Sequence, residues 1–300
     1  MLVSLEQAAL QLKSGELVSL PTETVYGLAA CIDLPDAIEN IFTLKKRPQD
    51  NPLIVHVATL SQMIALVENF PPHFTDLAEK FWPGPLSFVL TAKHVPEQVR
   101  AGLLTVCVRM PDHPLTLSVI EKVGPIVMPS ANLSGKPSAT TPAHVEEDFG
   151  KSFPVLDGGG CEKGIESTIL GYFEGQWRVL RLGSIPPEAF SPILGYEPTL
   201  SDRIVTPGQK HRHYSPSARL SLGNRPSCTV VVGYTDRKYP GQRLFALGSS
   251  QNPSEVSHHL YQVLRRLDQE GVVEACVDID VPKDGLWKSI LERLERASEE

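Results

Sequence analysis

The sequence predicts an α/β protein in which a large twisted mixed sheet with flanking helices precedes a smaller α/β domain. Three observations predict this fold class. Short apolar runs of strand length alternate irregularly with segments of helical periodicity. No repeat recurs at a period of about 20–50 residues, which excludes solenoids and propellers. The length of 300 residues suggests two domains, predicted over 1–200 and 220–300 with a linker over 201–219.

The first domain is predicted to start with a short helix, whose apolar stripe stops at Gly15. A strand follows in ELVSL, and a second helix is expected over 35–46. This helix must end near Arg47, since Pro48 disfavours the helical conformation in the residue before it. PLIVHV, LSFVL, TVCVRM and PIVM are predicted strands, and their continuous apolar character is typical of strands buried on both faces. STIL and WRVLRL supply two later strands.

The linker is predicted where this pattern breaks, over residues 201–219, which hold four Lys/Arg, two His and two Pro. Beyond it, CTVVVGY, RLFAL and VVEACVDI are predicted strands of the second domain. Asn252, Pro253 and Glu255 are typical of a helix start, as N-cap, first helical residue and third residue after the cap. This helix is expected to end at Gly271, and a last helix follows near the C-terminus.

Composition excludes several classes of protein. With 41% hydrophobic and 21% charged residues the chain is far from disordered composition, and its net charge of -7 argues against an extended nucleic-acid-binding surface. The apolar runs are too short for a membrane span, and the N-terminus lacks the pattern of a signal peptide. We therefore expect a cytoplasmic protein without membrane contact. Its five cysteines lie far apart and are expected to be reduced, mostly buried thiols: Cys31, Cys107, Cys161, Cys228 and Cys276.

Several common catalytic motifs are absent from the sequence. It has no phosphate-binding loop of the form G-x-x-x-x-G-K-S/T. Gly158-Gly159-Gly160 fails as a dinucleotide fingerprint, because Lys163 stands where the third glycine belongs. There is no H-E-x-x-H helix, no cysteine/histidine zinc spacing and no G-x-S-x-G turn, so no metal site is predicted.

Four polar segments stand out instead. They are PTETVYGL from residue 21, the basic triplet at 45–47 with the polar loop after it, the loop PSANLSGKPS over 129–138, and GIESTI over 164–169. Each has an ordinary alternative; the triplet, for example, would favour a helix C-terminus by about 0.3–1 kcal/mol. Arg109 is less ordinary, because it ends the apolar strand TVCV and a buried arginine needs an anionic partner.

Together these segments predict one ligand site. Cations from three places would converge with hydroxyl and amide groups at one edge of a parallel-rich sheet, where ligands bind in open α/β folds. These cations are Lys45, Arg47, Arg109 and Arg181. Such a site could hold a polyanion, such as a nucleoside triphosphate, together with a small carboxylate.

Seven motifs follow one another along the chain in this order: PTETVYGL, KKRPQDNPLIVHV, FWPGPLSFVL, TVCVRMPDHP, PSANLSGKPS, GIESTI and LRLG. Together they resemble the threonylcarbamoyl-AMP synthase family, which has the YrdC-type fold. TPGQKHRHYSPSARL, followed by a small Rossmann-like α/β domain, is similar to the long two-domain form of that family. The resemblance is dense from about residue 5 to 219 and loose beyond it.

The resemblance implies an activity. Members of the family make L-threonylcarbamoyladenylate and pyrophosphate from L-threonine, bicarbonate or CO2, and ATP. This is the first step of the threonylcarbamoyladenosine modification of tRNA, so the implied partners include the downstream tRNA threonylcarbamoyl-transfer machinery and, more weakly, tRNA itself. Mg2+ would arrive with ATP as a substrate complex, since such transfers need charge neutralisation and positioning more than covalent help.

The resemblance also implies roles for residues. Lys45 and Arg47 match a catalytic K-x-R motif that grips phosphates. The nucleotide side comprises Arg47, Asn51, Thr105, Asn132, Thr140, Arg181 and Tyr214, with Ser138 as an alternative to Thr140. The threonine side comprises Thr24, His56, Arg109, Ser130 and Ser167. No general base stands out, and the linker that bears Lys210 and Tyr214 is expected to fold over the nucleotide as a lid.

Two alternatives remain open from the sequence. The first is an RNA-binding module of the same fold without catalysis, against which the net charge of -7 argues. The second is a carbamoyl-transfer enzyme with the same fold and another substrate. Such carbamoyl-transfer domains usually sit in much longer chains with zinc-finger and acylphosphatase-like segments, and this sequence has neither.

Overall fold

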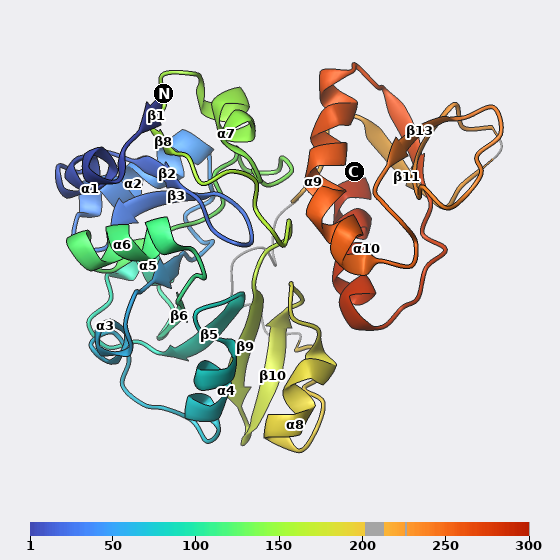
Figure 1. Cartoon of the computed structure of the whole chain (residues 1–300). Coiled ribbons are helices and arrows are strands. Elements are labelled where there is room, and N and C mark those ends of the chain that lie inside the picture. Colours follow the sequence, from blue (N-terminus) through green and yellow to red (C-terminus); the bar gives the residue numbers. More distant parts are fainter. Residues whose placement is uncertain (202–212, 226, 300) are drawn as a thin grey trace.

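The computed structural model describes residues 1–201, 213–225 and 227–299, which form two α/β domains (Figure 1). The strands of the first domain are β1 Leu2–Val3, β2 Val18–Leu20, β3 Gly27–Cys31, β4 Ile54–His56, β5 Leu86–Thr91, β6 Thr105–Arg109, β7 Ile126–Val127, β8 Val155–Leu156, β9 Thr168–Phe173 and β10 Gln176–Arg181. Its helices are α1 Leu5–Lys13, α2 Pro35–Lys45, α3 Leu60–Ile64, α4 Phe74–Phe81, α5 Glu97–Arg100, α6 Pro114–Val123, α7 Pro142–Phe149, the 3-10 turn Pro187–Phe190 and α8 Ser191–Leu194.

One mixed sheet organises the first domain, with the strand order β1-β8-β2-β3-β7-β4-β6-β5-β9-β10 in the described part of the chain. The predicted fold class is therefore confirmed. The expectation of a parallel-rich sheet is wrong near its centre. There β4 runs parallel to β6, but β7 is antiparallel to both β3 and β4, and β5 is antiparallel to β6. Of these antiparallel pairs, only β5 and β6 are consecutive strands in the chain, whereas β7 pairs with strands that lie far from it in the sequence.

The elements predicted from periodicity are present. Helix α1 has a capping box between Ser4 and Gln7, and α2 ends at Lys45 because Lys46 adopts the left-handed conformation, with φ 53°. The strands β1, β3 and β8, the helices α3 to α8 and the 3-10 turn before α8 were not predicted. Strand β3, GLAAC, lacks the large β-branched and aromatic residues that indicate strands, so its pairing with β2 and β7 defines it.

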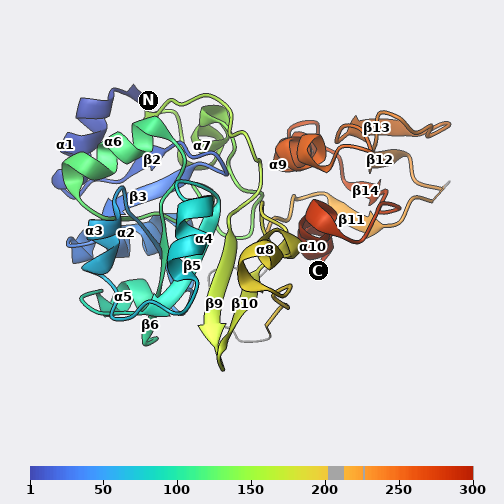
Figure 2. The ribbon, with the colours of Figure 1, turned by 60° about the horizontal axis from the view of Figure 1, so that its bottom comes forward.

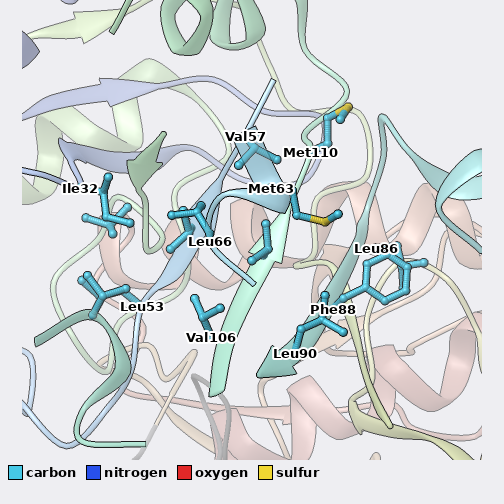
Figure 3. Packing of buried hydrophobic residues seen from close by; sticks show 14 of the residues in the cluster. Ile32, Leu53, Val57, Met63, Leu66, Leu86, Phe88, Leu90, Val106 and Met110 are labelled. Atoms are coloured by element: carbon cyan, nitrogen blue, oxygen red, sulfur yellow. The ribbon is translucent and has the colours of Figure 1, made fainter. Parts of the chain in front are cut away.

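The larger hydrophobic core lies between the sheet and the helices α2 to α4, and Figure 3 shows part of it. Its aromatic centre is Phe88 of β5, whose ring packs edge-to-face against Phe74, Trp82 and Trp177 with centroids 4.9, 5.1 and 5.6 Å apart. Fully burying one such side chain contributes about 1.5–3 kcal/mol relative to leaving it exposed. This core holds the middle of the sheet rigid and so fixes the strand ends that bear polar residues.

The second domain is built from β11 Arg219–Leu222, β12 Val230–Gly233, β13 Arg243–Ala246, α9 Pro253–Gln269, β14 Glu274–Val277 and α10 Gly285–Ser298. Its strands pair in parallel in the order β11-β14-β12-β13. The predicted start of α9 is confirmed, because the side chain of Asn252 accepts a hydrogen bond from the backbone N–H of Glu255 at 3.3 Å. Figures 1 and 2 show α9 and α10 between this small sheet and the first domain.

Two cysteines differ from expectation. Cys31, Cys107 and Cys161 are free and buried, as predicted. Cys228 and Cys276 instead form a disulfide with a Cα–Cα distance of 6.1 Å, so the prediction of five reduced thiols is wrong for this pair. The sequence could not indicate it, because the two residues are 48 positions apart and meet only when β14 pairs with β12.

None of the described helices has the length and apolar character needed to cross a membrane.

Candidate active site

A polar cavity opens where strand ends and loops of the first domain meet, and we call it the central cavity. It lies at the ends of β4, β6 and β10, the start of β9, and the loops after β2 and β7. Nine of the predicted site residues line it: Thr24, Arg47, His56, Arg109, Ser130, Asn132, Ser167, Arg181 and Tyr214. The structure thus brings together segments that are far apart in the sequence.

Arg109 finds the anionic partner that its burial requires. Its Nη2 donates to Oε1 of Glu23 at 2.6 Å, Nη1 donates to Oγ1 of Thr24 at 2.9 Å, and Nε donates to the carbonyl of Gly84 at 3.2 Å. Both members of this ion pair are buried, and the second oxygen of Glu23 accepts the backbone N–H of Asp112. A guanidinium has five N–H donors, so two of them have no partner among the described residues and could bind a carboxylate.

His56 lies directly beside Arg109, since the two residues are paired in the register of β4 and β6. The Nδ1 atom of His56 is 3.2 Å from the carbonyl oxygen of Ile54. Burial, and then the charge of Arg109, hold the pKa of this imidazole well below its usual range. A neutral ring that donates from Nδ1 to Ile54 presents Nε2 as a hydrogen-bond acceptor, which suits an ammonium or hydroxyl group of a ligand.

A second arginine is fixed on the other side of the central cavity. Arg181 donates from Nε and Nη2 to the carbonyl of Ser167 at 3.2 and 2.8 Å, and from Nη2 to the Ser167 hydroxyl at 3.0 Å. The Ser167 hydroxyl is also 2.8 Å from that of Ser87 on β5. Ser167 therefore joins Arg181 to the middle of the sheet, and the guanidinium is held in one place.

Arg47 is a third cation of the cavity wall. Its Nε donates to the carbonyl of Asn51 at 3.2 Å, and its Nη2 donates to the carbonyl of Pro52 at 2.8 Å. Burial, and then the nearby charge of Arg181, lower the pKa of Arg47 to about 9. The arginine is still protonated at neutral pH, and the closeness of like charges favours the binding of a polyanion between them.

Lys45 does not line the central cavity. Its side chain is only 1% exposed, and its Nζ donates to the carbonyl oxygens of Ser130 at 2.6 Å and of Asn132. Burial, and then Arg47, hold its pKa well below the usual range. The described geometry therefore makes Lys45 a support for the loop 130–132, while Arg47 faces the cavity.

Three further predicted residues lie behind or away from the cavity wall. Asn51 is buried, with its Oδ1 lacking a hydrogen-bond partner among the described residues. Thr140 is buried, with its hydroxyl 3.3 Å from Nδ1 of His144, whereas the alternative Ser138 lines the cavity. Thr105 begins β6 opposite Thr91, four residues from Arg109 and so about 13 Å along the strand.

Two residues of the predicted linker complete the wall. His213 and Tyr214 line the central cavity, and the Tyr214 ring stacks on that of Tyr261 with centroids 5.3 Å apart. Burial, and then Arg47, lower the pKa of His213 to about 3, which indicates a neutral ring. Residues 202–212 of the predicted lid, with Lys210, lie outside the described residues.

The sequence reasoning missed two acidic residues and a histidine. Glu23 lies within PTETVYGL and pairs with Arg109, and Glu166 lies within GIESTI and lines the cavity. Both motifs were selected for their hydroxyl groups. The signal that could have found the acids is the rule already applied to Arg109, namely that buried cations and anions occur in pairs. His213 lies within the predicted lid, in which only Lys210 and Tyr214 were singled out.

The fold and the cavity define a class of protein: an α/β protein with a cavity at its strand ends whose arginines suit a small anionic ligand. The chain belongs to the Sua5/YciO/YrdC family. Residues 10–183 match the Sua5_yciO_yrdC family model, described as "Telomere recombination". Residues 185–299 match "Threonylcarbamoyl-AMP synthase, C-terminal domain".

Relatives match along nearly the whole chain. The threonylcarbamoyl-AMP synthase of Pyrococcus abyssi is 38% identical over 316 residues, which cover 96% of this chain and 92% of the relative. That of Bacillus subtilis is 37% identical and covers 97% and 92%. The crystal structure of P. abyssi Sua5 complexed with L-threonine superimposes with a TM-score of 0.90 at 37% identity, covering 98% of this chain and 94% of that one. Escherichia coli YciO, at 22% identity and a TM-score of 0.53, shares the fold of the first domain.

Proposed function

We propose that this chain is an L-threonylcarbamoyladenylate synthase, an ATP-dependent nucleotidyltransferase. It converts L-threonine, bicarbonate or CO2, and ATP into threonylcarbamoyl-AMP and pyrophosphate. The observation that carries the proposal is the match, at a TM-score of 0.90 and over both domains, to a Sua5 protein complexed with L-threonine. The arginine-lined central cavity supplies the chemistry that such substrates need.

The threonine half of the cavity would be built on Arg109. The two N–H groups not engaged by described residues bind the carboxylate of threonine, and Glu23 keeps the guanidinium oriented. Neutral His56 and the Thr24 hydroxyl accept hydrogen bonds from the amine or hydroxyl of the substrate. Ser130 and Ser167 close the same end of the cavity. This arrangement selects a small amino acid by its carboxylate and its polar side chain.

The nucleotide half would be built on Arg47 and Arg181. Their guanidinium groups lie on the cavity wall and neutralise the phosphates of MgATP, which brings its own Mg2+ as substrate. Asn132, whose buried Oδ1 has no hydrogen-bond partner among the described residues, can accept from the nucleotide. Lys45 acts by holding the carbonyls of residues 130 and 132 in place.

The chemistry needs two bond-forming steps. The threonine amine attacks CO2 to form a carbamate and loses a proton. A carbamate oxygen then attacks the α-phosphorus of ATP, and the bond to the leaving pyrophosphate breaks in line. Carbamates decompose in water, so the rings of His213 and Tyr214 on the cavity wall favour the reaction by excluding solvent.

The product is a reactive mixed anhydride, which must be consumed by a group-transfer enzyme. We assign that step to the tRNA threonylcarbamoyl-transfer machinery. We also propose that this chain acts in the cytoplasm. Any direct contact of this chain with tRNA would be weak, given the net charge of -7.

One assay tests the proposal: pyrophosphate release with bicarbonate, MgATP and each of the twenty amino acids in turn. We expect release with L-threonine and little with the other amino acids. Release without any amino acid would contradict the proposal. Tight RNA binding with no release would favour the RNA-binding alternative, and release driven by carbamoyl phosphate would favour the carbamoyl-transfer alternative.

A further inference from the structure

The carboxylate of Glu166 is one point at which the second domain contacts the wall of the central cavity. Glu166 lies in the segment 164–169 of the first domain, lines the cavity and is 7% exposed. It immediately precedes Ser167, the residue that holds Arg181. Two of the three residues that the structure describes as hydrogen-bond partners of its side chain nevertheless belong to the second domain.

In the part of the chain that the structure describes, three donors from three elements meet on this carboxylate. Oε1 accepts from the Ser138 hydroxyl at 2.6 Å, and Ser138 ends the loop that bears Ser130 and Asn132. The hydroxyl of Tyr261 on α9 lies 2.8 Å from Oε2 and 3.1 Å from Oε1. Nε of Arg293 on α10 donates to Oε2 at 3.2 Å. The carboxylate thus joins two walls of the cavity to two helices of the other domain.

The two partners in the second domain are themselves fixed. Arg293 is fully buried, donates from Nη2 to the carbonyl of Leu182 at 2.7 Å, and lies 5.2 Å from the centroid of the Tyr214 ring. Tyr261 is also fully buried and stacks against Tyr214. Both side chains therefore arrive at Glu166 preoriented, and both also support Tyr214 on the cavity wall.

The backbone around Glu166 is equally tied to the second domain. Ile165 belongs to the hydrophobic core of that domain, together with Val25 from the first polar segment. A Cβ added at Gly164 would lie 2.3 Å from the carbonyl oxygen of Ser257 on α9, so only glycine permits this approach. The segment 164–166 is thus packed between the domains.

Electrostatics make the second domain necessary for this arrangement. Burial would raise the pKa of Glu166, but Arg293, then Arg181 and the Ser138 hydrogen bond, outweigh it and hold the pKa below its usual range. Without α9 and α10 the Glu166 side chain would keep Ser138 but lose the Tyr261 hydroxyl and the ion pair with Arg293. Its carboxylate would then be open to solvent, and these contacts would no longer fix it between the two walls of the cavity.

We infer that Glu166 is a positioning residue through which the C-terminal domain fixes the substrate cavity. Paired with Tyr261 and Arg293, it holds the Ser138 loop and the Ser167–Arg181 pair in the geometry that binds substrate. The consequence for catalysis rests on the proposed function, whereas the structural coupling does not.

The coupling is tested first without substrate, by hydrogen–deuterium exchange of the full-length protein. Tyr261→Phe removes one donor from Glu166 and keeps the stacked ring. We expect exchange in residues 136–139 and 164–168 to rise roughly tenfold. Ser289→Ala is the matched control, because it removes another buried hydrogen bond between the domains, from Oγ to the carbonyl of Gly183 at 2.8 Å, without touching Glu166. It should leave the exchange of both segments near the wild-type rate.

A double-mutant cycle on activity tests the consequence. Tyr261→Phe and Glu166→Gln should each raise the KM for threonine by roughly tenfold, and the double variant should be no worse than Glu166→Gln alone. Ser289→Ala should have the same small effect on wild-type and Glu166→Gln backgrounds. Glu166→Gln/Arg293→Met removes both buried charges at once and so leaves neither of them unpaired.

Several outcomes would overturn the inference. They are unchanged exchange at 164–168 in Tyr261→Phe, additive effects in the cycle, or equal losses in Tyr261→Phe and Ser289→Ala. Wild-type rates of exchange and of turnover in Glu166→Gln/Arg293→Met would do the same. If the wild-type protein releases no pyrophosphate with threonine, the proposed function fails, and the exchange experiment still decides on the coupling.

Discussion

Among the described residues, two buried ion pairs lie beside the central cavity, and they are built in different ways. Glu23 and Arg109 lie within the first domain, 2.6 Å apart, on a loop and a strand end that the sheet positions. Glu166 and Arg293 lie 3.2 Å apart across the domain boundary. The first pair depends on the fold of one domain, whereas the second also depends on docking of the other. The end of the cavity at Glu23 and Arg109 therefore depends on the first domain alone, and we call these two residues the intrinsic pair. The end at Glu166 depends on both domains, and we call it the shared end.

The largest effect is expected from breaking the intrinsic pair. Arg109→Ala removes the proposed carboxylate ligand, and loss of a charge-assisted contact should weaken threonine binding by roughly ten- to 150-fold. It also strands buried Glu23, which should cost about 3–5 kcal/mol of stability. Calorimetric titration and thermal unfolding measure both effects.

Glu23→Gln/Arg109→Ala is the control that separates them. It should restore much of the stability but not the threonine affinity. Restored affinity, or an equal loss of ATP binding in Arg109→Ala, would mean that Arg109 has only a structural role.

The next effect compares a cation on the cavity wall with one behind it. Arg47→Ala should lower ATP affinity by about tenfold or more in a protein that still folds. Lys45→Met should instead lower stability by about 1–3 kcal/mol, because it leaves the carbonyls of Ser130 and Asn132 unsatisfied. Titration with ATP and urea unfolding of both variants measure these effects. A loss of ATP affinity in Lys45→Met together with a mere loss of stability in Arg47→Ala would contradict the assignment.

Acid should weaken the docking of the second domain on the first. Asp148 of α7 is paired with Arg265 of α9, so this ion pair joins the two domains. Burial alone would raise the pKa of Asp148, but Arg265 and then Lys136 outweigh it. The pKa of Asp148, like that of Glu166, is therefore held below the usual range. A depressed carboxylate pKa contributes stability above the unfolded pKa of about 4, and this contribution is lost as pH falls through the folded value. We therefore expect domain docking to weaken below about pH 4. Small-angle scattering and limited proteolysis between the domains would show this, and docking unchanged to pH 2 would contradict it.

The smallest effect is expected at the rim of the shared end. Lys136 is 45% exposed on its side chain and pairs with Asp148 at 3.0 Å, but Asp148 also accepts from Arg265 at 2.7 Å. Lys136→Ala should therefore change stability by less than about 1 kcal/mol. A larger loss in thermal unfolding would mean that the Asp148 carboxylate depends on both cations.

The same comparison explains how far the sequence could be interpreted. Arg109, His56 and Arg181 could be predicted because they end strands with clear apolar patterns. Their meeting point required only that strand ends converge. Glu166 could not be assigned a partner, because Tyr261 and Arg293 are 95 and 127 residues away and no local pattern encodes domain docking. A motif also leaves the position of a side chain undetermined. Lys45 belongs to a motif but does not line the cavity, and Thr105 lies at the other end of β6 from Arg109.

Val25 and Ile165 have a consequence for how such a protein can change over time. Both belong to the first domain in sequence, yet they pack in the hydrophobic core of the second. The domain boundary along the chain is therefore not the boundary between the two cores. The second domain cannot be exchanged as a cassette cut at the linker, because a donor domain must also accommodate these two side chains and the glycine at position 164. A chimaera should fold only when the segment PTETVYGL, which contains Val25, and the segment around Ile165 come from the same parent protein as the C-terminal domain.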